Sequence, residues 1–147
     1  MTSYTRNTYV DGTTPAISAA NLNNNEAGLD ALYGAWTSAA PTVTASTGTF
    51  TSVSATRRHL YQGKVCHFNL EITITTVGTA SGFVQVDLPV AAAGPSVFVG
   101  RERNATGLIV YGQVLATSTQ ILIRDYSNTS IIGAGRIINL SGSYEIA

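Results

Sequence analysis

The feature that most constrains the fold is a run of alternating residues from Val65 to Thr75. Every second position of this run is apolar: Cys66, Phe68, Leu70, Ile72 and Ile74. The positions between them are polar: His67, Asn69, Glu71, Thr73 and Thr75. Because successive side chains of a strand point to opposite faces, a period of two predicts a strand with one buried face and one solvent face.

Further candidate strands follow one another after residue 37, separated by breaks that contain Gly, Ser or Pro. The expected strands are Thr49–Tyr61, Val65–Thr75, Phe83–Leu88, Val97–Arg101, Leu108–Leu115, Ile121–Arg124 and Ile137–Ile146. Seven or eight short strands with no helix between them predict a mainly β fold, either an antiparallel sandwich or a barrel. We expect a jelly-roll-like sandwich over residues 37–147.

The first 36 residues have a different character. Residues 1–17 show no period and contain the breakers Asp11-Gly12 and Pro15, so we expect an extended arm, either docked on a partner or a loose tail. Residues 18–36 predict one short helix with Ser18 as its N-cap. Residues 1–36 therefore form a unit for oligomerisation and attachment, ahead of the β-domain.

An apolar stripe along the predicted helix indicates what it packs against. The stripe consists of Leu22, Leu29, Leu32, Tyr33 and Trp36. The asparagine run at 23–25 and Gly28 are poor helix formers, so the helix is weak alone and needs a partner. Copies of the same helix would supply that partner around the axis of a homo-oligomer, with a trimer favoured. The alternative is that the helix docks on its own sheet.

Composition excludes several classes of protein. Only 11% of residues are charged and the net charge is zero, with Lys64 as the single lysine, so a nucleic-acid partner is not expected. No apolar run approaches the roughly 20 residues that span a bilayer, and no signal peptide is visible, so we expect a product made in the cytoplasm without membrane insertion. The single cysteine excludes an internal disulfide. A polar surface with little charge tolerates close packing against other copies.

The sequence predicts no catalytic, cofactor-binding or metal-binding residue. Gly78-Thr-Ala-Ser-Gly82 has its serine one position too late for a nucleophile elbow. The carboxylates of the strand region are isolated in sequence: Glu71, Asp87, Glu102, Asp125 and Glu145. Cys66 and His67 point to opposite faces of one strand and do not readily share an ion, although a trimer axis could gather three copies of one histidine. We therefore expect a protein that is not an enzyme.

Two basic clusters are candidates for surface contact with an acidic partner or a polysaccharide. They consist of Arg57, Arg58 and His59 in one segment, and Arg101 and Arg103 in another. The alternative for both clusters is ion pairing between subunits or a solvated strand face. Exposed aromatics on neighbouring strands would instead mark a carbohydrate-binding groove, for which the candidates are Tyr61, Phe83, Tyr111 and Tyr126. Alternatively, these four aromatic side chains pack in the core or in an interface between subunits.

The segment from Asp11 to Glu26 reads Asp-Gly-Thr-Thr-Pro-Ala-Ile-Ser-Ala-Ala-Asn-Leu-Asn-Asn-Asn-Glu. It resembles a segment frequent near the N-terminus of tailed-bacteriophage fibre and appendage proteins, where a similar run leads into a short helix. That resemblance implies trimerisation and attachment to the virion. The segment departs from the family at Asn25, where an apolar residue is common, and this weakens the predicted helix seam.

Pieces of the later sequence are similar in order to β-domains of phage fibre tips and head fibres. They are Arg58-His-Leu-Tyr-Gln-Gly-Lys-Val, Val86-Asp-Leu-Pro and Leu140-Ser-Gly-Ser-Tyr-Glu. The resemblance implies a virion structural protein of head-fibre or tail-fibre type, with capsid, portal or tail proteins as partners and a host surface glycan as a candidate partner. The alternatives are a capsid decoration or cement protein, and a carbohydrate-binding module.

Overall fold

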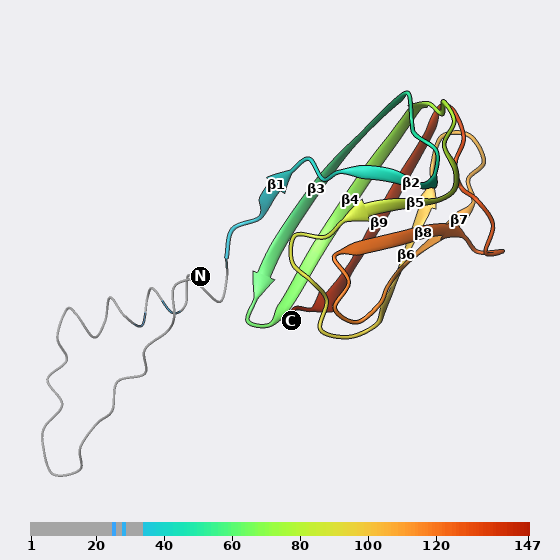
Figure 1. Cartoon of the computed structure of the whole chain (residues 1–147). Helices are drawn as coiled ribbons and strands as arrows, with labels where there is room; N and C mark the ends of the chain where they lie inside the picture. The colour runs from blue at the N-terminus through green and yellow to red at the C-terminus, as the bar shows by residue number, and fades with distance from the viewer. Residues whose placement is uncertain (1–24, 26–27, 29–33) are drawn as a thin grey trace, which may run out of the picture.

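The structure, a computed structural model, describes Asn25, Gly28 and residues 34–147 (Figure 1). Nine strands are found within residues 34–147: β1 Thr37–Ala39, β2 Val43–Thr47, β3 Ser52–Gln62, β4 Val65–Thr76, β5 Ser81–Asp87, β6 Ser96–Glu102, β7 Ile109–Val114, β8 Gln120–Asp125 and β9 Arg136–Glu145. Every pairing between them is antiparallel, which confirms the prediction of a mainly β, antiparallel fold.

The predicted strands agree with β3 to β9, with ends that differ by up to three residues. The alternation within β4 is also confirmed, because the five apolar side chains at every second position from Cys66 to Ile74 are all at most 2% exposed. The sequence analysis missed β1 and β2. These strands are short and lie at the two ends of the pairing order, where one partner strand suffices and little apolar surface is buried.

The strands form one curled sheet in the order β1-β3-β4-β9-β6-β7-β8-β5-β2. Figure 1 shows the long strands β3, β4 and β9 side by side, with β2, β5 and β8 crossing them as a second layer. Strand β6 joins the layers, because it pairs with β9 on one side and β7 on the other. Strand β2 then contacts β3, so the curled sheet nearly closes on itself. The jelly-roll arrangement stays a prediction.

Two glycines allow the layers to approach closely where β6 meets β9. A Cβ added to Gly100 would lie 2.0 Å from the carbonyl oxygen of Asn139, and one added to Gly142 would lie 2.5 Å from the ring of Phe98. Any larger residue at either position would therefore push β6 away from β9. Because neither glycine has a side chain, the sheet can bend sharply where β6 pairs with β9.

The core lies between the two layers. Phe68, Phe98 and Tyr144 form an aromatic cluster at its centre, with the two phenylalanine rings edge to face at a centroid distance of 4.8 Å. The Tyr144 hydroxyl donates to the carbonyl oxygen of Val90 at 3.0 Å, so this buried polar group is satisfied. Aliphatic side chains complete the core: Leu70, Ile72, Ile74, Val84, Val86, Val110, Val114, Ile121, Ile123, Ile131, Ile138 and Leu140.

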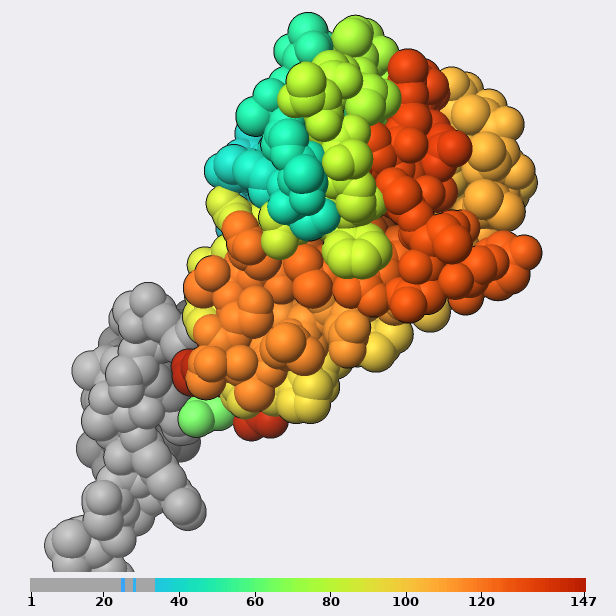
Figure 2. All heavy atoms as spheres, turned by 45° about the vertical axis from the view of Figure 1, so that its right-hand side comes forward, coloured from blue at the N-terminus to red at the C-terminus, as the bar shows by residue number. Residues whose placement is uncertain are grey.

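One end of the molecule is closed by the segments that flank β2 and β5. Figure 2 shows residues 43–50 and 75–83 next to one another there. The N–H of Thr79 donates to the carbonyl oxygen of Thr49 at 3.1 Å, and the Thr79 hydroxyl accepts from the N–H of Thr49 at 3.1 Å. This pairing extends the contact between β2 and β5 beyond the strands.

Most of the predicted N-terminal unit lies outside the described residues. This applies to the extended arm over 1–17 and to four residues of the apolar stripe: Leu22, Leu29, Leu32 and Tyr33. Residues 34–36 are described and are not helical, which differs from the predicted helix end at 36. Pairing of β1 with β3 begins at Thr37, directly after these three residues.

Candidate functional site

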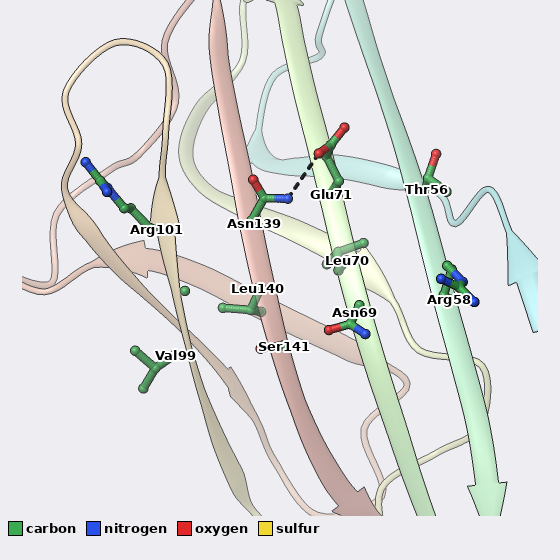
Figure 3. A pocket seen from close by; sticks show the side chains of 11 residues that line it. Thr56, Arg58, Asn69, Leu70, Glu71, Val99, Arg101, Asn139, Leu140 and Ser141 are labelled. Atoms are coloured by element: carbon green, nitrogen blue, oxygen red, sulfur yellow. Dashed lines mark hydrogen bonds between the residues drawn. The ribbon is translucent and has the colours of Figure 1, made fainter. Parts of the chain in front are cut away.

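The outer face of β3, β4, β9 and β6 carries a trough with a volume of about 700 Å³. Seven of its eleven lining residues are polar: Thr56, Arg58, Asn69, Glu71, Arg101, Asn139 and Ser141. The other four are Leu70, Val99, Gly100 and Leu140. Figure 3 shows Arg58 and Arg101 at opposite borders, on β3 and β6, with Asn69 and Asn139 between them. A volume in the range of known ligand pockets and convergent polar groups mark it as the candidate site.

Strand register explains why these residues share one surface. Side chains directly opposite one another in neighbouring strands lie on the same face of a sheet. One row of such partners runs through Thr56, Glu71, Asn139 and Arg101. The next row on the same face runs through Arg58, Asn69, Ser141 and Val99. The trough lies over these two rows, and the small side chain of Ser141 leaves room in its floor.

The negative charge inside the trough is already neutralised. The carboxylate of Glu71 accepts a hydrogen bond from the guanidinium of Arg103 at 2.9 Å, in an ion pair whose side chains are about half exposed. The same carboxylate oxygen accepts from Asn139 Nδ2 at 3.1 Å. This second bond fixes the amide of Asn139, so its carbonyl oxygen remains available to a ligand.

The two other arginines of the trough have no ion-pair partner among the described residues. The guanidinium of Arg58 lies 5.5 Å from the ring centroid of Trp36, a cation–π contact that restrains it at the border. Arg101 extends from β6 on the opposite border. With Glu71 balanced by Arg103, the trough has an excess of positive charge in a chain whose net charge is zero.

The basic residues predicted for surface contact are divided between the two faces of the sheet. Arg58, Arg101 and Arg103 are exposed, as surface contact requires. Arg57 and His59 are only 8% and 7% exposed, so their prediction as surface contacts is wrong for the described chain. Both point inward because they alternate with Arg58 along β3, and Arg57 Nη1 donates to the carbonyl oxygen of Asp87 at 2.6 Å.

Burial changes the chemistry of this inward pair. It lowers the pKa of His59, and the neighbouring charge of Arg57 lowers it further. Neither His59 Nδ1 nor Arg57 Nε has a hydrogen-bond partner among the described residues. The imidazole is therefore held neutral next to a buried cation.

Trp36, predicted as part of the oligomerisation stripe, is 42% exposed and lies beside Arg58. The structure thus gives this side chain a contact within the β-domain.

The four aromatics of the predicted carbohydrate-binding groove do not form one groove. Tyr61 packs against the core from β3. On the outer face of β5, β8 and β7, Phe83 and Tyr111 lie on either side of Arg124. The ring centroid of Phe83 lies 3.8 Å from the guanidinium carbon of Arg124, and Tyr111 is the cross-strand partner of Arg124. The Tyr111 hydroxyl and the Arg124 guanidinium both donate to Asn128 Oδ1. Phe83 and Tyr111 therefore belong to one local cluster, whereas Tyr61 lies apart from it and Tyr126 is exposed.

Sequence reasoning named Arg58 and Arg101 but missed most of the trough. It placed Asn69 and Glu71 on the polar face of β4 without assigning them a role. Asn139 and Ser141 occupy the corresponding face of β9, and polar residues facing outward on two long strands were the available signal. What no single segment reveals is that β9 pairs with β4, which is more than 60 residues away in the chain.

A buried carboxylate organises the loop after β6. Glu102 is fully buried, and its carboxylate accepts hydrogen bonds from the N–H groups of Asn104, Ala105, Thr106 and Gly107 and from the Thr106 hydroxyl. Burial alone would raise the pKa of this carboxyl. The donors from Ala105, Thr106 and Asn104 outweigh burial and hold the pKa well below its usual range.

Asp125 has a similar part in the turn after β8. Its carboxylate accepts from the hydroxyl and N–H of Thr129 and from the N–H of Ser127. The hydroxyl of Thr129 is the main reason that the pKa of Asp125 is lowered. Apart from the N–H of Ile137 in β9, which donates to Glu102 at 3.3 Å, the donors to Glu102 and Asp125 come from their own adjoining turns, so both carboxylates are structural.

Within residues 34–147 and at Asn25 and Gly28, no group of three or more His, Cys, Asp or Glu side chains is arranged to hold a metal ion. Cys66 is buried, and burial raises the pKa of its thiol. The described part of the chain contains no helix with the length and apolar character needed to cross a membrane.

Comparisons with protein-family models, with curated proteins and with solved structures give no match.

Proposed function

We propose that this chain is a structural subunit of a tailed-phage particle. In this proposal it forms a trimeric fibre or appendage, attached to the particle by its N-terminal segment, and the β-domain contacts the host surface. The observation that carries the proposal is the segment from Asp11 to Glu26, which resembles the attachment segment of phage fibre and appendage proteins.

The surface of the β-domain supports assembly into an oligomer. Three large apolar side chains are exposed on or beside β6 and β7, outside the lining of the trough: Val97, Ile109 and Tyr126. We call these residues the β6–β7 patch. Val97 and Ile109 lie on the same outer face of two paired strands, and the N–H of Tyr126 donates to the carbonyl oxygen of Ile109. Several large apolar side chains exposed on one face mark a candidate interface.

Contact with the host surface is supported by the trough. It lies on the outer face of the sheet and displays amides, hydroxyls and guanidinium groups, which are the groups that bind saccharides and anions in other proteins. Three copies on one appendage would multiply weak contacts through avidity.

The oligomeric state of the full chain tests the attachment unit. We expect sedimentation equilibrium to give a trimer, and we expect the double variant Leu22→Asp, Leu29→Asp to sediment as a smaller species, because charge on the apolar stripe opposes helix association. The double variant Asn23→Asp, Asn24→Asp adds the same charge beside the stripe and serves as the control. A wild-type monomer at high concentration, or a trimer unchanged in the double variant, contradicts this role of the N-terminal unit.

Particle association tests the location. We expect mass spectrometry of purified particles of the phage that encodes this chain to detect it, and cross-linking to join residues 1–17 to another virion protein. Copy number separates an appendage from a capsid decoration protein, which predicts tens to hundreds of copies on each particle. Absence of the chain from washed, infectious particles would exclude a virion role.

A further inference from the structure

We infer that the trough on the outer face of β3, β4, β9 and β6 binds an anionic saccharide, one that carries at least two carboxylate or sulfate groups along its length. This inference rests on the proposed function in one respect: it names the class of surface molecule that the β-domain would contact. The geometry on which it depends belongs to the β-domain alone.

The positive charge of the trough is available to a ligand. Among the described residues, the only ion pair joins Arg103 to Glu71, and it cancels the single carboxylate of the trough. Arg58 and Arg101 are left as exposed guanidinium groups on opposite borders. A guanidinium binds carboxylate and sulfate through paired N–H donors, which makes anions the preferred partners.

The positions of the two arginines indicate an extended ligand. Strands β4 and β9 lie between β3 and β6, so three interstrand spacings, or roughly 14 Å, separate the strands that carry Arg58 and Arg101. Each guanidinium therefore contacts a different part of the ligand. An oligosaccharide with a charge on successive units fits this arrangement better than a single small anion does.

The floor between the arginines suits sugar hydroxyl groups, which both donate and accept hydrogen bonds. Asn69 makes no side-chain hydrogen bond within the described residues, so its amide offers a donor and an acceptor. Asn139 donates to Glu71 and keeps its carbonyl oxygen free. The hydroxyls of Thr56 and Ser141 add two further groups of the same dual character.

The alternative macromolecular ligand is an acidic peptide, and the strand pairing disfavours it. Extended peptides commonly bind by adding a strand to an open sheet edge. The trough lies over β4, β9 and β6, each paired on both sides, and over the part of β3 that pairs with β1 and β4. Backbone groups here are already used, so recognition depends on side chains alone.

The test titrates the ¹⁵N-labelled full chain with trigalacturonate, which has a carboxylate on each ring, and separately with a chondroitin sulfate tetrasaccharide. Maltotriose, which is neutral, and pentaglutamate, which is an acidic peptide, are the comparison probes. We expect at least one anionic saccharide to shift the side-chain amide signals of Asn69 and Asn139. Maltotriose and pentaglutamate should shift neither signal at the same concentration. The two saccharides together show whether carboxylate or sulfate is preferred.

Variants locate the site. Arg58→Gln and Arg101→Gln should each weaken binding by about tenfold, because each removes one charge-assisted contact. Asn69→Asp should abolish binding, since it places an unbalanced negative charge in the floor at an exposed position. Lys64→Gln, which removes one positive charge from the β3–β4 turn, should leave the affinity unchanged.

Three results would overturn the inference: no amide shift with either anionic saccharide, equal binding of pentaglutamate, or an equal loss of affinity in Lys64→Gln and Arg58→Gln. These results are separate from those that test the virion role. If the chain is a trimer on particles but binds neither saccharide, the saccharide site is contradicted and the virion role is not. If the chain binds saccharide through Arg58 and Arg101 but is absent from particles, the virion role is contradicted and the saccharide site is not.

Discussion

At the scale of single residues, the buried carboxylate of Glu102 has the clearest energetic role. Five donors from the loop after β6 surround it, so the charged form is favoured in the folded chain although the group is fully buried. A glutamine side chain in the same place has only one acceptor oxygen. Its NH₂ group would face the N–H donors of the loop, which it cannot accept from. The loop therefore requires a carboxylate at this position.

We expect Glu102→Gln to lower the free energy of unfolding at pH 7 by about 2–4 kcal/mol, because several buried donors lose their acceptor. Urea unfolding followed by tryptophan fluorescence or circular dichroism measures this change. Glu145→Gln, at an exposed position near the end of β9, is the control and should change stability little. A loss in Glu102→Gln no larger than in the control would show that the loop does not depend on the carboxylate.

The same residue predicts how stability varies with pH. A carboxyl whose pKa is lowered by folding contributes stability above its unfolded pKa, about 4.3 for Glu. That contribution is lost as the pH falls from there toward the folded pKa. Asp125 acts in the same direction. We expect the wild type to lose stability steeply below about pH 5 and Glu102→Gln to show a shallower loss, both measured by urea unfolding from pH 7 to pH 3. Parallel curves would contradict this account.

Arg57 and His59 show what a run of basic residues means in a strand. Three consecutive basic residues look like one surface cluster in the sequence, yet alternation divides them between the two faces. Only Arg58 reaches the trough. The period of two that located the strand also determines which of its charges can reach a partner.

At the scale of elements, the line where β6 crosses β9 decides the shape of the sheet. We expect Gly100→Ala to destabilise the fold by about 1–3 kcal/mol, because its Cβ would overlap the backbone of Asn139 and force the strands apart. Thermal or urea unfolding gives the change. Gly94→Ala is the matched control, since a Cβ at Gly94 meets nothing within 4 Å.

Equal stability of the two alanine variants would mean that β6 and β9 separate at little cost, and that the glycine is not what shapes the fold. Asn69 and Asn139 both line the trough. If their side-chain amide NMR signals shift in Gly100→Ala, the contact between β6 and β9 also determines the shape of the trough.

Of the nine strands within residues 34–147, seven could be predicted from the sequence because each carries a local signal, either alternation as in β4 or a short run rich in apolar and β-branched residues between turn residues, as in β6. Strand β4 is the clearest case. The short strands β1 and β2 carry no such signal, because none of their side chains is more than partly buried and no run of apolar residues is needed there. Strand order could not be predicted either, because the pairing of β4 with β9 depends on contacts between distant segments. The trough depends on that order, so its two arginines were visible in the sequence and its floor was not.

At the scale of the whole molecule, the proposal of an oligomer has a thermodynamic consequence. If folding is coupled to association, the unfolding temperature rises with protein concentration by mass action, because dilution favours the dissociated chain. We expect differential scanning calorimetry of the wild type at about 5 µM and about 500 µM to show this rise. A monomer unfolds at the same temperature at both concentrations.

The β6–β7 patch indicates which surface contributes to that coupling. Val97 and Ile109 are 66% and 58% exposed, and burying them against sister chains would stabilise the oligomer through the hydrophobic effect. We expect the double variant Val97→Thr, Ile109→Thr to reduce the dependence of the unfolding temperature on concentration, while dilute samples unfold near the wild-type temperature because Thr is well tolerated in strands. Val65→Thr is the matched control, since this exposed valine begins β4, away from the patch. A double variant that associates as tightly as the wild type would show that these apolar side chains face solvent in the assembly, and that the N-terminal unit alone holds the chains together.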